Sequence, residues 1–367
     1  MNTSTTGTSA RKGPARVVFE HVTKRYGNSP VAAVNDVSIV FPAGKLVTLL
    51  GPSGCGKTTT LRMIAGLEMC SSGRILIGED DVTRLPATER DVSMVFQSYA
   101  LFPHMTVMEN VSYGLRMSGF ARDAILPKAN EVLKQLGIDT FARRYPNELS
   151  GGQQQRVAVA RAIVLEPRVL LFDEPLSNLD AKLRRYVRQE IRDLQQSLGL
   201  TVVYVTHDQE EALAVSDTIV VMNNAVIAQT GAPRELHDLP QSRFVADFIG
   251  EANVLPCEVV SGGGAGDTHA TVKLGGLTLR TNACEGSAAQ RHVAVRPNRV
   301  SLQPAGSPDT LEATVQKATY VGEQMEYIVQ SALGDLFVTS ADTGHPIAAG
   351  SSVALGFGAG DVVLLRD

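Results

Sequence analysis

Several features are missing from this 367-residue sequence, and each absence removes a class of protein. No apolar run approaches the roughly 20 residues of a membrane-spanning helix. The Ser- and Thr-rich start before Arg16 lacks the apolar stretch of a secretory signal. Basic residues are not in excess, because the net charge is −4 and the part after Phe244 carries 7 basic against 13 acidic residues. We therefore expect no membrane span, no secretory signal and no nucleic-acid binding.

Metal-binding and redox patterns are also missing. The four cysteines lie far apart and form no CxxC pair; they are Cys55, Cys70, Cys257 and Cys284. This usage is typical of reduced thiols in a cytosolic protein. The histidines other than His207 show no metal-ligand spacing, and we interpret them as structural or solvated.

The apolar pattern divides the chain into a short tail and two domains. Residues 1–15 read as a disordered tail. Residues 16–244 alternate continuous apolar runs with helical patterns, which predicts an α/β domain around a mostly parallel sheet. Within it, about residues 105–165 are helix-like throughout and predict a helical insert. Residues 245–367 hold short β-rich runs between Gly-rich turns, which predicts a small all-β sandwich or barrel.

A glycine-rich turn carries the strongest chemical signal. It follows the apolar run Leu46–Leu50, opens a helix-like segment and fits the GxxxxGK[ST] motif with Gly51, Pro52, Ser53, Gly54, Cys55, Gly56, Lys57 and Thr58. Glycines let backbone N–H groups surround a phosphate, Lys57 reaches the β- and γ-phosphates, and Thr58 supplies a magnesium ligand. The flanking strand and helix favour this P-loop over a chance glycine-rich turn. No base lies beside Cys55, so we interpret it as a small loop residue.

Two carboxylates end another apolar run. Val169–Phe172 is followed directly by Asp173 and Glu174. Downstream of a P-loop, Asp173 fits a role near magnesium, and Glu174 fits the residue that polarises the attacking water. An ordinary acidic strand end is the alternative.

Leu149–Gln153 precedes an amphipathic helix. Ser150 suits the N-cap position, and the two glycines that follow expose backbone donors at a helix N-terminus. The residues alone leave open whether this is a second anion site or simply a capped helix start.

Taken together, these motifs resemble the ATP-binding cassette (ABC) family. The resemblance rests on their order over about residues 17–230: an aromatic Tyr26, the P-loop, Gln97 after a strand, the signature Leu149–Gln153, Asp173-Glu174, Ser177–Asp180 and Thr206–Asp208. It implies an α/β P-loop ATPase fold with a helical subdomain, and ATP and Mg²⁺ as cofactors.

The resemblance also implies a role for each matching residue. Lys57, Thr58 and Thr59 bind phosphate and magnesium, and Asp173 is a further metal-site residue. Gln97 contacts magnesium or water and senses the membrane partner. Glu174 is the catalytic base or water-orienting group, and His207 contacts the γ-phosphate. Tyr26 is implied to stack against adenine. The other implied nucleotide-binding residues are Ser150, Gly152, Gln153 and Asp180. Of these, Ser150 and Gly152 are implied to touch the γ-phosphate of the ATP held by a second subunit.

The chain carries one set of these motifs and no expected membrane span, so the resemblance implies that it works with a second copy of itself and with separate membrane subunits. Two copies sandwich two ATP molecules head to tail, on the cytoplasmic face of the cell membrane, where they join integral permease subunits and, indirectly, a solute-binding protein. We expect the apolar side chains of Tyr99, Phe102 and Met105 to form a notch for a permease helix. We expect no nucleic-acid partner.

The stretch Val95–Val107 followed by Glu109–Val111 resembles the importer branch of the family. The C-terminal region resembles the OB-like TOBE domain of importer ATPases, with Val295–Pro297 at a recurrent turn. The sequence leaves two roles possible for this domain: a packing or dimerisation module, or a regulatory site for a ligand. The implied cargoes are 2-aminoethylphosphonate, polyamines or ferric iron, with sugars as the alternative. A non-transport ATPase acting on nucleic acid is the rival class, which the acidic C-terminal part disfavours.

Overall fold

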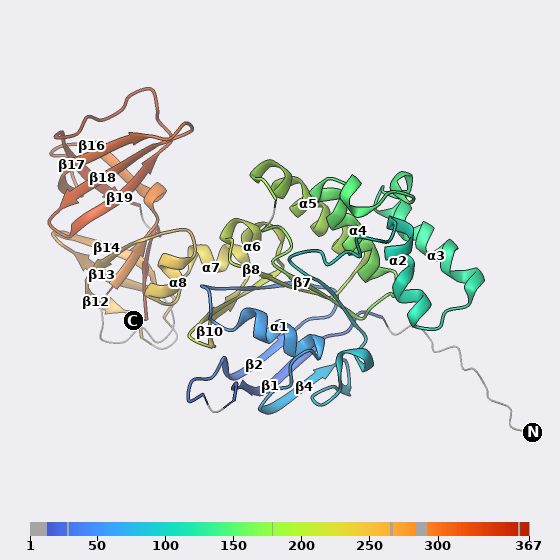
Figure 1. Cartoon of the computed structure of the whole chain (residues 1–367). Helices are drawn as coiled ribbons and strands as arrows, with labels where there is room; N and C mark the ends of the chain where they lie inside the picture. The colour runs from blue at the N-terminus through green and yellow to red at the C-terminus, as the bar shows by residue number, and fades with distance from the viewer. Residues whose placement is uncertain are drawn as a thin grey trace, which may run out of the picture. The chain divides into compact units, whose positions relative to one another are not determined.

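The computed structural model describes residues 13–27, 29–177, 179–264, 267–283, 292–358 and 360–366. The chain divides into two compact units, Met1–Pro233 and Arg234–Asp367 (Figure 1). This division falls earlier than the boundary expected after Phe244. Cys284 and most of the expected tail lie outside the described residues. Ala15, at the end of that tail, is buried and donates its N–H to the carbonyl oxygen of Arg168.

A six-stranded sheet in the order β10-β9-β3-β8-β7-β6 forms the centre of the first unit. Its strands are β3 (Leu46–Leu50), β6 (Val92–Val95), β7 (Val169–Asp173), β8 (Val202–Thr206), β9 (Thr218–Asn223) and β10 (Val226–Gly231). All neighbours pair in parallel except β10, which is antiparallel to β9. Every residue of β3 and β8 is buried, as the continuous apolar runs predict for strands covered on both faces.

Side chains of the central strands alternate between two hydrophobic cores. Leu170 and Phe172 of β7 belong to one core, whereas Val169 and Leu171 belong to the other. Helix α1 (Lys57–Ala65) lies in the second core, between the central sheet and an antiparallel sheet (Figure 1). That sheet has the order β2-β1-β4-β5, with β1 (Val17–Lys24), β2 (Val34–Phe41), β4 (Ser72–Ile77) and β5 (Asp80–Asp81).

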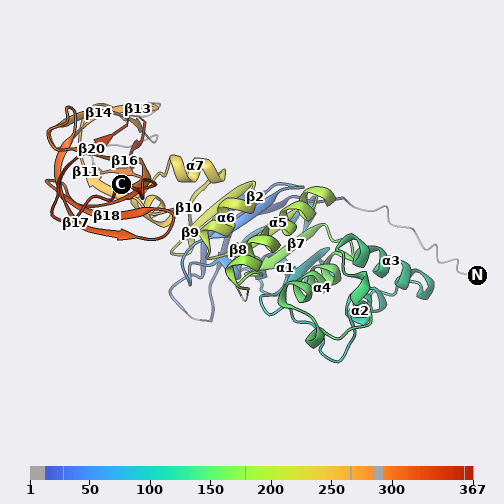
Figure 2. The same ribbon diagram turned by 90° about the horizontal axis from the view of Figure 1, so that it is seen from above.

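The first core is covered by the other helices of this unit. The helical insert is observed as α2 (Val107–Met117), α3 (Arg122–Gln135) and α4 (Gly151–Ile163), which gather on one side of the central sheet (Figure 2). The remaining helices are α5 (Ala181–Leu198) and α6 (Gln209–Val215), with short 3₁₀ turns η1 (Ala87–Glu89), η2 (Asp139–Phe141) and η3 (Pro146–Glu148). No helix in the described ranges has the length and apolarity needed to cross a membrane.

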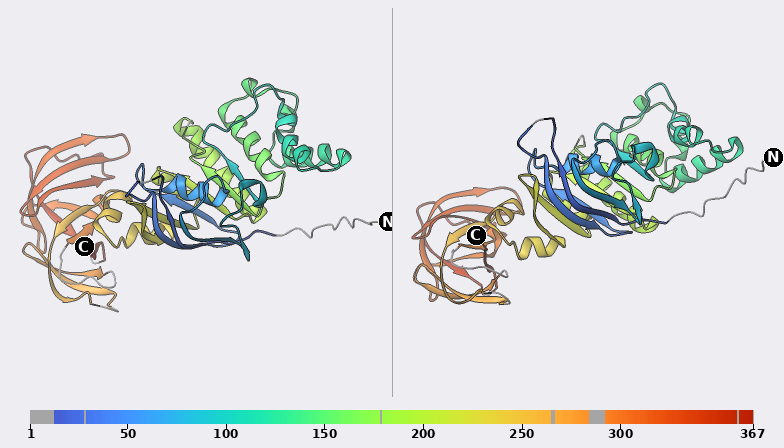
Figure 3. Two further views of the ribbon diagram at one scale, coloured as in Figure 1. Left: turned by 60° about the horizontal axis from the view of Figure 1, so that its bottom comes forward. Right: turned by 90° about the horizontal axis from the view of Figure 1, so that it is seen from below.

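The second unit consists of two curled sheets that share one core (Figure 3). The first, in the order β11-β15-β21-β14-β13-β12, contains β11 (Asn253–Pro256), β12 (Glu258–Gly262), β13 (His269–Leu274), β14 (Leu277–Ala283), β15 (His292–Val295) and β21 (Val362–Leu364). The second, in the order β16-β20-β17-β18-β19, contains β16 (Val300–Pro304), β17 (Leu311–Tyr320), β18 (Met325–Ser331), β19 (Gly334–Ser340) and β20 (Ser352–Phe357). The short segments outside the sheets are α7 (Pro233–Asp238), α8 (Arg243–Phe248) and η4 (Pro297–Arg299). The expected all-β architecture is therefore present.

One buried cation holds the start of the second unit together. The guanidinium of Arg296 donates hydrogen bonds to the carbonyl oxygens of His237, Ala246 and Glu251, at 2.6–3.1 Å. Burial lowers the pKa of Arg296 to about 10, which keeps the group charged at neutral pH. The turn Val295–Pro297, noted in the sequence, therefore anchors main-chain carbonyls of α7, α8 and the following turn.

Asp217 joins three elements of the first unit. Its carboxylate accepts a hydrogen bond from the N–H of Leu46, at the start of β3, over 2.9 Å. Arg192 of α5 donates to the same carboxylate at 2.8 and 3.1 Å. The hydrogen bond from Arg192 holds the pKa of Asp217 below its usual value.

Replacing Asp217 by Asn should lower the free energy of unfolding of the first unit at pH 7 by about 1–3 kcal/mol, because a charged hydrogen-bond acceptor is lost. Folding lowers the pKa of the Asp217 carboxyl below its ordinary value of 3.8. The ionised carboxylate therefore contributes fully to the free energy of unfolding at pH values above 3.8. This contribution is lost as the pH falls through the lower pKa of the folded state. Urea unfolding at pH 7 and pH 3 measures both effects. Asp193→Asn, on the exposed face of α5, is the control and should change stability by less than about 0.5 kcal/mol. Equal losses in the two variants would contradict the role of Asp217.

Candidate functional site

A cavity of about 230 Å³ opens at the end of β3, where the glycine-rich loop turns into α1. Its lining consists of Ala33, Ser53, Gly54, Gly56, Lys57, Thr58, Thr59 and Glu174. Most of the residues that the sequence assigns to phosphate binding therefore meet Glu174, which lies more than 100 positions later. Gly51, Pro52 and Cys55 belong to the same loop but do not line the cavity.

Two glycines allow the close packing of this loop. A Cβ atom on Gly51 would overlap the carbonyl oxygen of Met222, at the end of β9, and lie 2.7 Å from the Cys55 sulfur. Gly56 has φ +107° and a Cβ there would lie 2.5 Å from the carbonyl oxygen of Ala33. Side chains at these positions would push the loop away from its neighbours.

Lys57 supplies the positive charge of the cavity. Its side chain is buried, and its ammonium donates to the carbonyl oxygens of Gly51 at 2.7 Å and Pro52 at 3.0 Å. Gly56 caps α1 without a side-chain hydrogen bond, so the first N–H groups of the helix remain directed at the loop. Ammonium and helix N-terminus together favour an anion in this cavity.

Cys55 packs beneath the loop. Burial is the main cause that raises the pKa of its thiol, although Lys57 acts in the opposite direction. The thiol is therefore neutral at neutral pH, which agrees with its interpretation as a small loop residue and not a nucleophile.

Asp173 and Thr58 form the oxygen-rich side of the site. The Thr58 hydroxyl donates to an Asp173 carboxylate oxygen over 3.3 Å. Burial raises the pKa of Asp173, whereas the Thr58 hydrogen bond opposes this shift. Within the described ranges, no group of three or more His, Cys, Asp or Glu side chains could hold a metal ion. A cation bound here would therefore need further ligands from a substrate or from water.

Glu174 and His207 are brought together by the parallel sheet. Asp173 of β7 pairs with Val205 of β8, so the residues after these two strands leave the sheet side by side. Glu174 adopts φ +45°, which is rare for a non-glycine residue, and its N–H donates to the Val205 carbonyl oxygen. Its carboxylate lies 3.1 Å from Nδ1 of His207. A carboxylate held beside an imidazole at the rim of an anion cavity can orient and polarise a water molecule.

Gln97 reaches the same region from β6. Its side-chain amide donates to the Ser177 hydroxyl over 3.1 Å, and that hydroxyl donates to the Glu174 carbonyl oxygen over 3.1 Å. Ser177 thus connects Gln97 to the backbone of Glu174. It was not among the predicted site residues, although it begins the motif Ser177–Asp180 on which the resemblance partly rests.

The signature residues and Asp180 do not line this cavity. The Ser150 hydroxyl accepts from the Gln153 N–H, and the Gln153 side chain accepts from the Ser150 N–H, which makes a complete capping box for α4. Asp180 caps α5 through its side chain alone, which accepts from the Leu183 N–H at 2.9 Å. Gly152 lets α4 approach α5, because a Cβ there would lie 3.2 Å from the Leu183 side chain.

Tyr26 also lies apart from the cavity lining. Its ring is 44% exposed, and the ammonium of Lys24 stands 4.8 Å from the ring centroid. A partly exposed ring can stack on a planar group, but Tyr26 is not one of the residues that line this cavity.

The expected apolar notch needs one correction. Tyr99 is buried in the core shared by the helices, and its exposed fraction is only 5%, so it cannot contact a partner. Arg161 of α4 fixes its position by donating to the carbonyl oxygens of Tyr99 and Ala100. Phe102 and Met105 are half-buried, and Phe102 lies 4.8 Å from the ring centre of Tyr113. Sequence reasoning treated Tyr99 as a surface residue because its contact with Arg161, which lies 62 positions later, cannot be read from the local sequence.

Comparison with known protein families gives two matches. Residues 34–177 match the "ABC transporter" family model, which covers the loop, the signature and Asp173-Glu174. Residues 293–365 match the "TOBE domain" model.

The chain is also similar to known ATP-binding proteins and to a solved ATP-binding cassette structure. "Fe(3+) ions import ATP-binding protein FbpC" of Brucella abortus is 58% identical over 89% of this chain and 90% of that protein. The protein of the same description from Rhizobium etli is 55% identical over 94% of this chain and 96% of that protein. The dimeric, post-hydrolysis structure of the ATP-binding cassette MJ0796 bound to ADP and Pi has a TM-score of 0.53 and 32% identity, over 59% of this chain and 99% of that one.

Gly51→Ala should weaken the binding of ATP strongly, because the new methyl group collides with backbone of β9. The matched control is Gly54→Ala in the same loop, where no heavy atom lies within 4 Å of the new Cβ and only the strain of φ +80° is added. We expect the affinity of Gly51→Ala to fall at least about tenfold below that of Gly54→Ala, measured by calorimetry, since a backbone overlap costs more than the roughly 1–2 kcal/mol of left-handed strain. Equal affinities would refute the packing argument.

Proposed function

This chain belongs to the ABC transporter family, and we propose that it is the ATP-hydrolysing subunit of an importer whose cargo is ferric iron. The meeting of Lys57, Thr58 and Glu174 in one cavity supports the ATPase part. The iron part rests on relatives that are 55–58% identical over most of the chain and are described as Fe(3+) ion importers. Among the cargoes implied by the sequence, ferric iron is therefore preferred over 2-aminoethylphosphonate, polyamines and sugars.

We propose that different residues bind the phosphates of ATP and activate the attacking water. Lys57 and the N-terminus of α1 hold the β- and γ-phosphates of ATP. The Glu174 carboxylate orients the attacking water, and His207, 3.1 Å away, contacts the γ-phosphate. Gln97 reports this state to the membrane partner through Ser177 and the backbone of Glu174. Each of these roles is supported by the hydrogen bonds that already fix the side chains.

A magnesium ion fits the donor set of Thr58 and Asp173, because both offer oxygen and Mg²⁺ prefers oxygen ligands with several waters and substrate phosphates. When bound, such an ion neutralises phosphate charge. Burial of Asp173 raises its pKa, and a nearby cation would favour the ionised form that the ion requires. Gln97, also proposed as a metal-site residue, donates to Ser177 through its amide nitrogen, while its carbonyl oxygen is the atom suited to a cation.

Two copies are needed to complete the site in this proposal. Ser150, Gly152, Gln153 and Asp180 stand at the starts of α4 and α5 and do not line the cavity of their own chain. In a head-to-tail dimer they face the ATP held by the other copy. The dimeric MJ0796 cassette, bound to ADP and Pi, provides a related case. The pair would act at the cytoplasmic face of the cell membrane with permease subunits and a solute-binding protein.

Glu174→Gln should reduce ATP hydrolysis by roughly 10²- to 10⁴-fold, because the amide cannot accept a proton from water. ATP binding should persist, so an ATP-bound dimer should accumulate and be visible by size-exclusion chromatography with light scattering. Glu210→Gln, an exposed glutamate on α6, is the control and should hydrolyse ATP at the unchanged rate. Wild-type turnover by Glu174→Gln would disprove the water-activating role.

The cargo is tested by uptake in the native host carrying only Glu174→Gln. Labelled ferric iron, 2-aminoethylphosphonate, spermidine and maltose are supplied in parallel. We expect the uptake of ferric iron to fall to the level of a deletion strain, while the other three remain unchanged. Loss of a different solute would reassign the cargo, and normal uptake of ferric iron would reject it.

A further inference from the structure

Arg184 of α5 contacts two segments to which the proposed function gives a role in ATP hydrolysis. Its guanidinium donates to the carbonyl oxygen of Leu179 over 3.2 Å and to the carboxylate of Asp208 over 3.1 Å. Leu179 directly precedes Asp180, the cap of α5, and Asp208 directly follows His207. One side chain therefore joins the segment before α5 to the turn that carries His207.

The turn around His207 is held on both sides by one hydrogen-bond network. Before it, the Thr206 hydroxyl donates to a Glu211 carboxylate oxygen over 2.8 Å and accepts from the Asp208 N–H over 3.0 Å. After it, one carboxylate oxygen of Asp208 caps α6 by accepting from the Glu211 N–H at 3.1 Å, and the other accepts from Arg184. A displacement of Asp208 therefore moves the main chain at position 207.

Glu211 places a second carboxylate in this network. Its side chain is buried, accepts from the Tyr204 hydroxyl at 3.1 Å and lies 3.8 Å from Nε of Arg184. Burial raises the pKa of Glu211, and the charge of Asp208 acts in the same direction. Loss of the Arg184 cation would therefore leave two carboxylates that repel each other at the start of α6, and the turn before this helix would shift.

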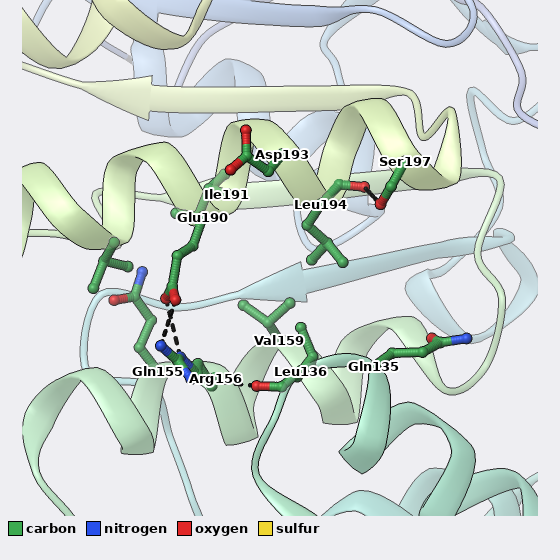
Figure 4. A pocket seen from close by; sticks show the side chains of 11 residues that line it. Gln135, Leu136, Gln155, Arg156, Val159, Glu190, Ile191, Asp193, Leu194 and Ser197 are labelled. Carbon is green, nitrogen blue, oxygen red and sulfur yellow. Dashed lines mark hydrogen bonds and ion pairs between the residues drawn. The ribbon is translucent and has the colours of Figure 1, made fainter.

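Helix α5 can carry a displacement from its start to this turn. Arg184 lies one turn into the helix, where its N–H donates to the Asp180 carbonyl oxygen over 2.8 Å. Farther along, Glu190 accepts from Arg156 of α4 over 3.0 Å (Figure 4). The Gln155 amide, buried beside this pair, has no hydrogen-bond partner among the described residues and adds no polar contact. The start of α5 is thus connected through Arg184 to the turn before α6.

We propose that Arg184 is a positioning residue for ATP hydrolysis, which makes the position of His207 depend on the Asp180 segment that the second copy engages. The inference rests on the proposed function, in which Asp180 faces the ATP of the other copy and His207 contacts the γ-phosphate. Closure of the dimer fixes the Asp180 segment, and Arg184 passes this constraint to Asp208. The His207 ring is then held beside Glu174. Arg184 itself does not line the nucleotide cavity.

Arg188 provides a matched control on the same helix. It lies one turn after Arg184 and also ties α5 to α6, because it donates to the Glu210 carbonyl oxygen over 3.1 Å. The two side chains have the same charge and the same pair of helices as neighbours. They differ in that the Arg188 contact ends within α6, whereas the Arg184 contact ends beside His207.

The test compares Arg184→Gln with Arg188→Gln in the full-length chain. Turnover is measured over ranges of ATP and protein concentration, which separates kcat, KM for ATP and the protein concentration at which the dimer forms. Arg184→Gln should lower kcat at least about tenfold, while KM and the dimer midpoint stay within about twofold of the wild type. Arg188→Gln should leave all three quantities within about twofold.

A double-mutant cycle tests whether Arg184 acts through His207. The residual hydrolysis of His207→Ala is measured in single turnovers. In this background Arg184→Gln should change the rate by less than about twofold, because the group that it positions is absent. If Arg184→Gln does not fold, Arg184→Lys replaces it and should also lower kcat, since an ammonium keeps the charge but lacks the planar fork that spans two acceptors.

Three results would overturn the proposal. These are equal kcat values for the Arg184 and Arg188 variants, a fall in kcat that comes with a matching rise in KM or a loss of the dimer, and an undiminished effect of Arg184→Gln in the His207→Ala background. The wild-type rate separates this proposal from the proposed function. A wild-type chain that does not hydrolyse ATP would reject the proposed function, whereas normal hydrolysis by Arg184→Gln would reject the role of Arg184 alone.

Discussion

Parallel pairing of β3, β8, β7 and β6 is the constraint on which the candidate site depends. Parallel strands bring their C-terminal ends to one edge, so the loop after β3, Glu174 after β7, His207 after β8 and Gln97 after β6 emerge together. The two hydrophobic cores hold this sheet from both faces. Hydrogen bonds then link the ends of neighbouring strands, from Gln97 after β6 to Ser177 after β7 and between Glu174 after β7 and His207 after β8.

Much of this arrangement could be predicted from sequence because it is encoded locally. Continuous apolar runs mark β3, β7 and β8, and the glycine-rich turn has a fixed relation to the strand before it and the helix after it. The strands β14, β16 and β21 carry weaker local signals, since β14 and β16 mix apolar with polar residues and β21 has only three residues. Such strands acquire their order from neighbours that lie far away in sequence.

Contacts between distant segments were beyond sequence reasoning. Tyr99 follows a predicted strand and has an amphipathic ring, yet Arg161 fixes its main chain and the ring is buried. The signature glycine Gly152 was assigned to the nucleotide, whereas its first visible constraint is the close approach of α5. The orphan amide of Gln155 belongs to the same helix. Neither its burial nor its lack of partners can be read from a run of three consecutive glutamines.

The buried Arg296 also determines which piece of the chain can be exchanged between proteins during evolution. Its guanidinium is satisfied by main-chain carbonyls at positions 237, 246 and 251, so the contacts depend on the path of the backbone and not on side-chain chemistry at those positions. A recombination event that joins a new β-rich module at residue 245 would leave behind the carbonyl of His237 and bury a cation with part of its shell missing. A module that keeps the shell of Arg296 complete therefore includes the compact unit from Arg234 onward, with both short helices.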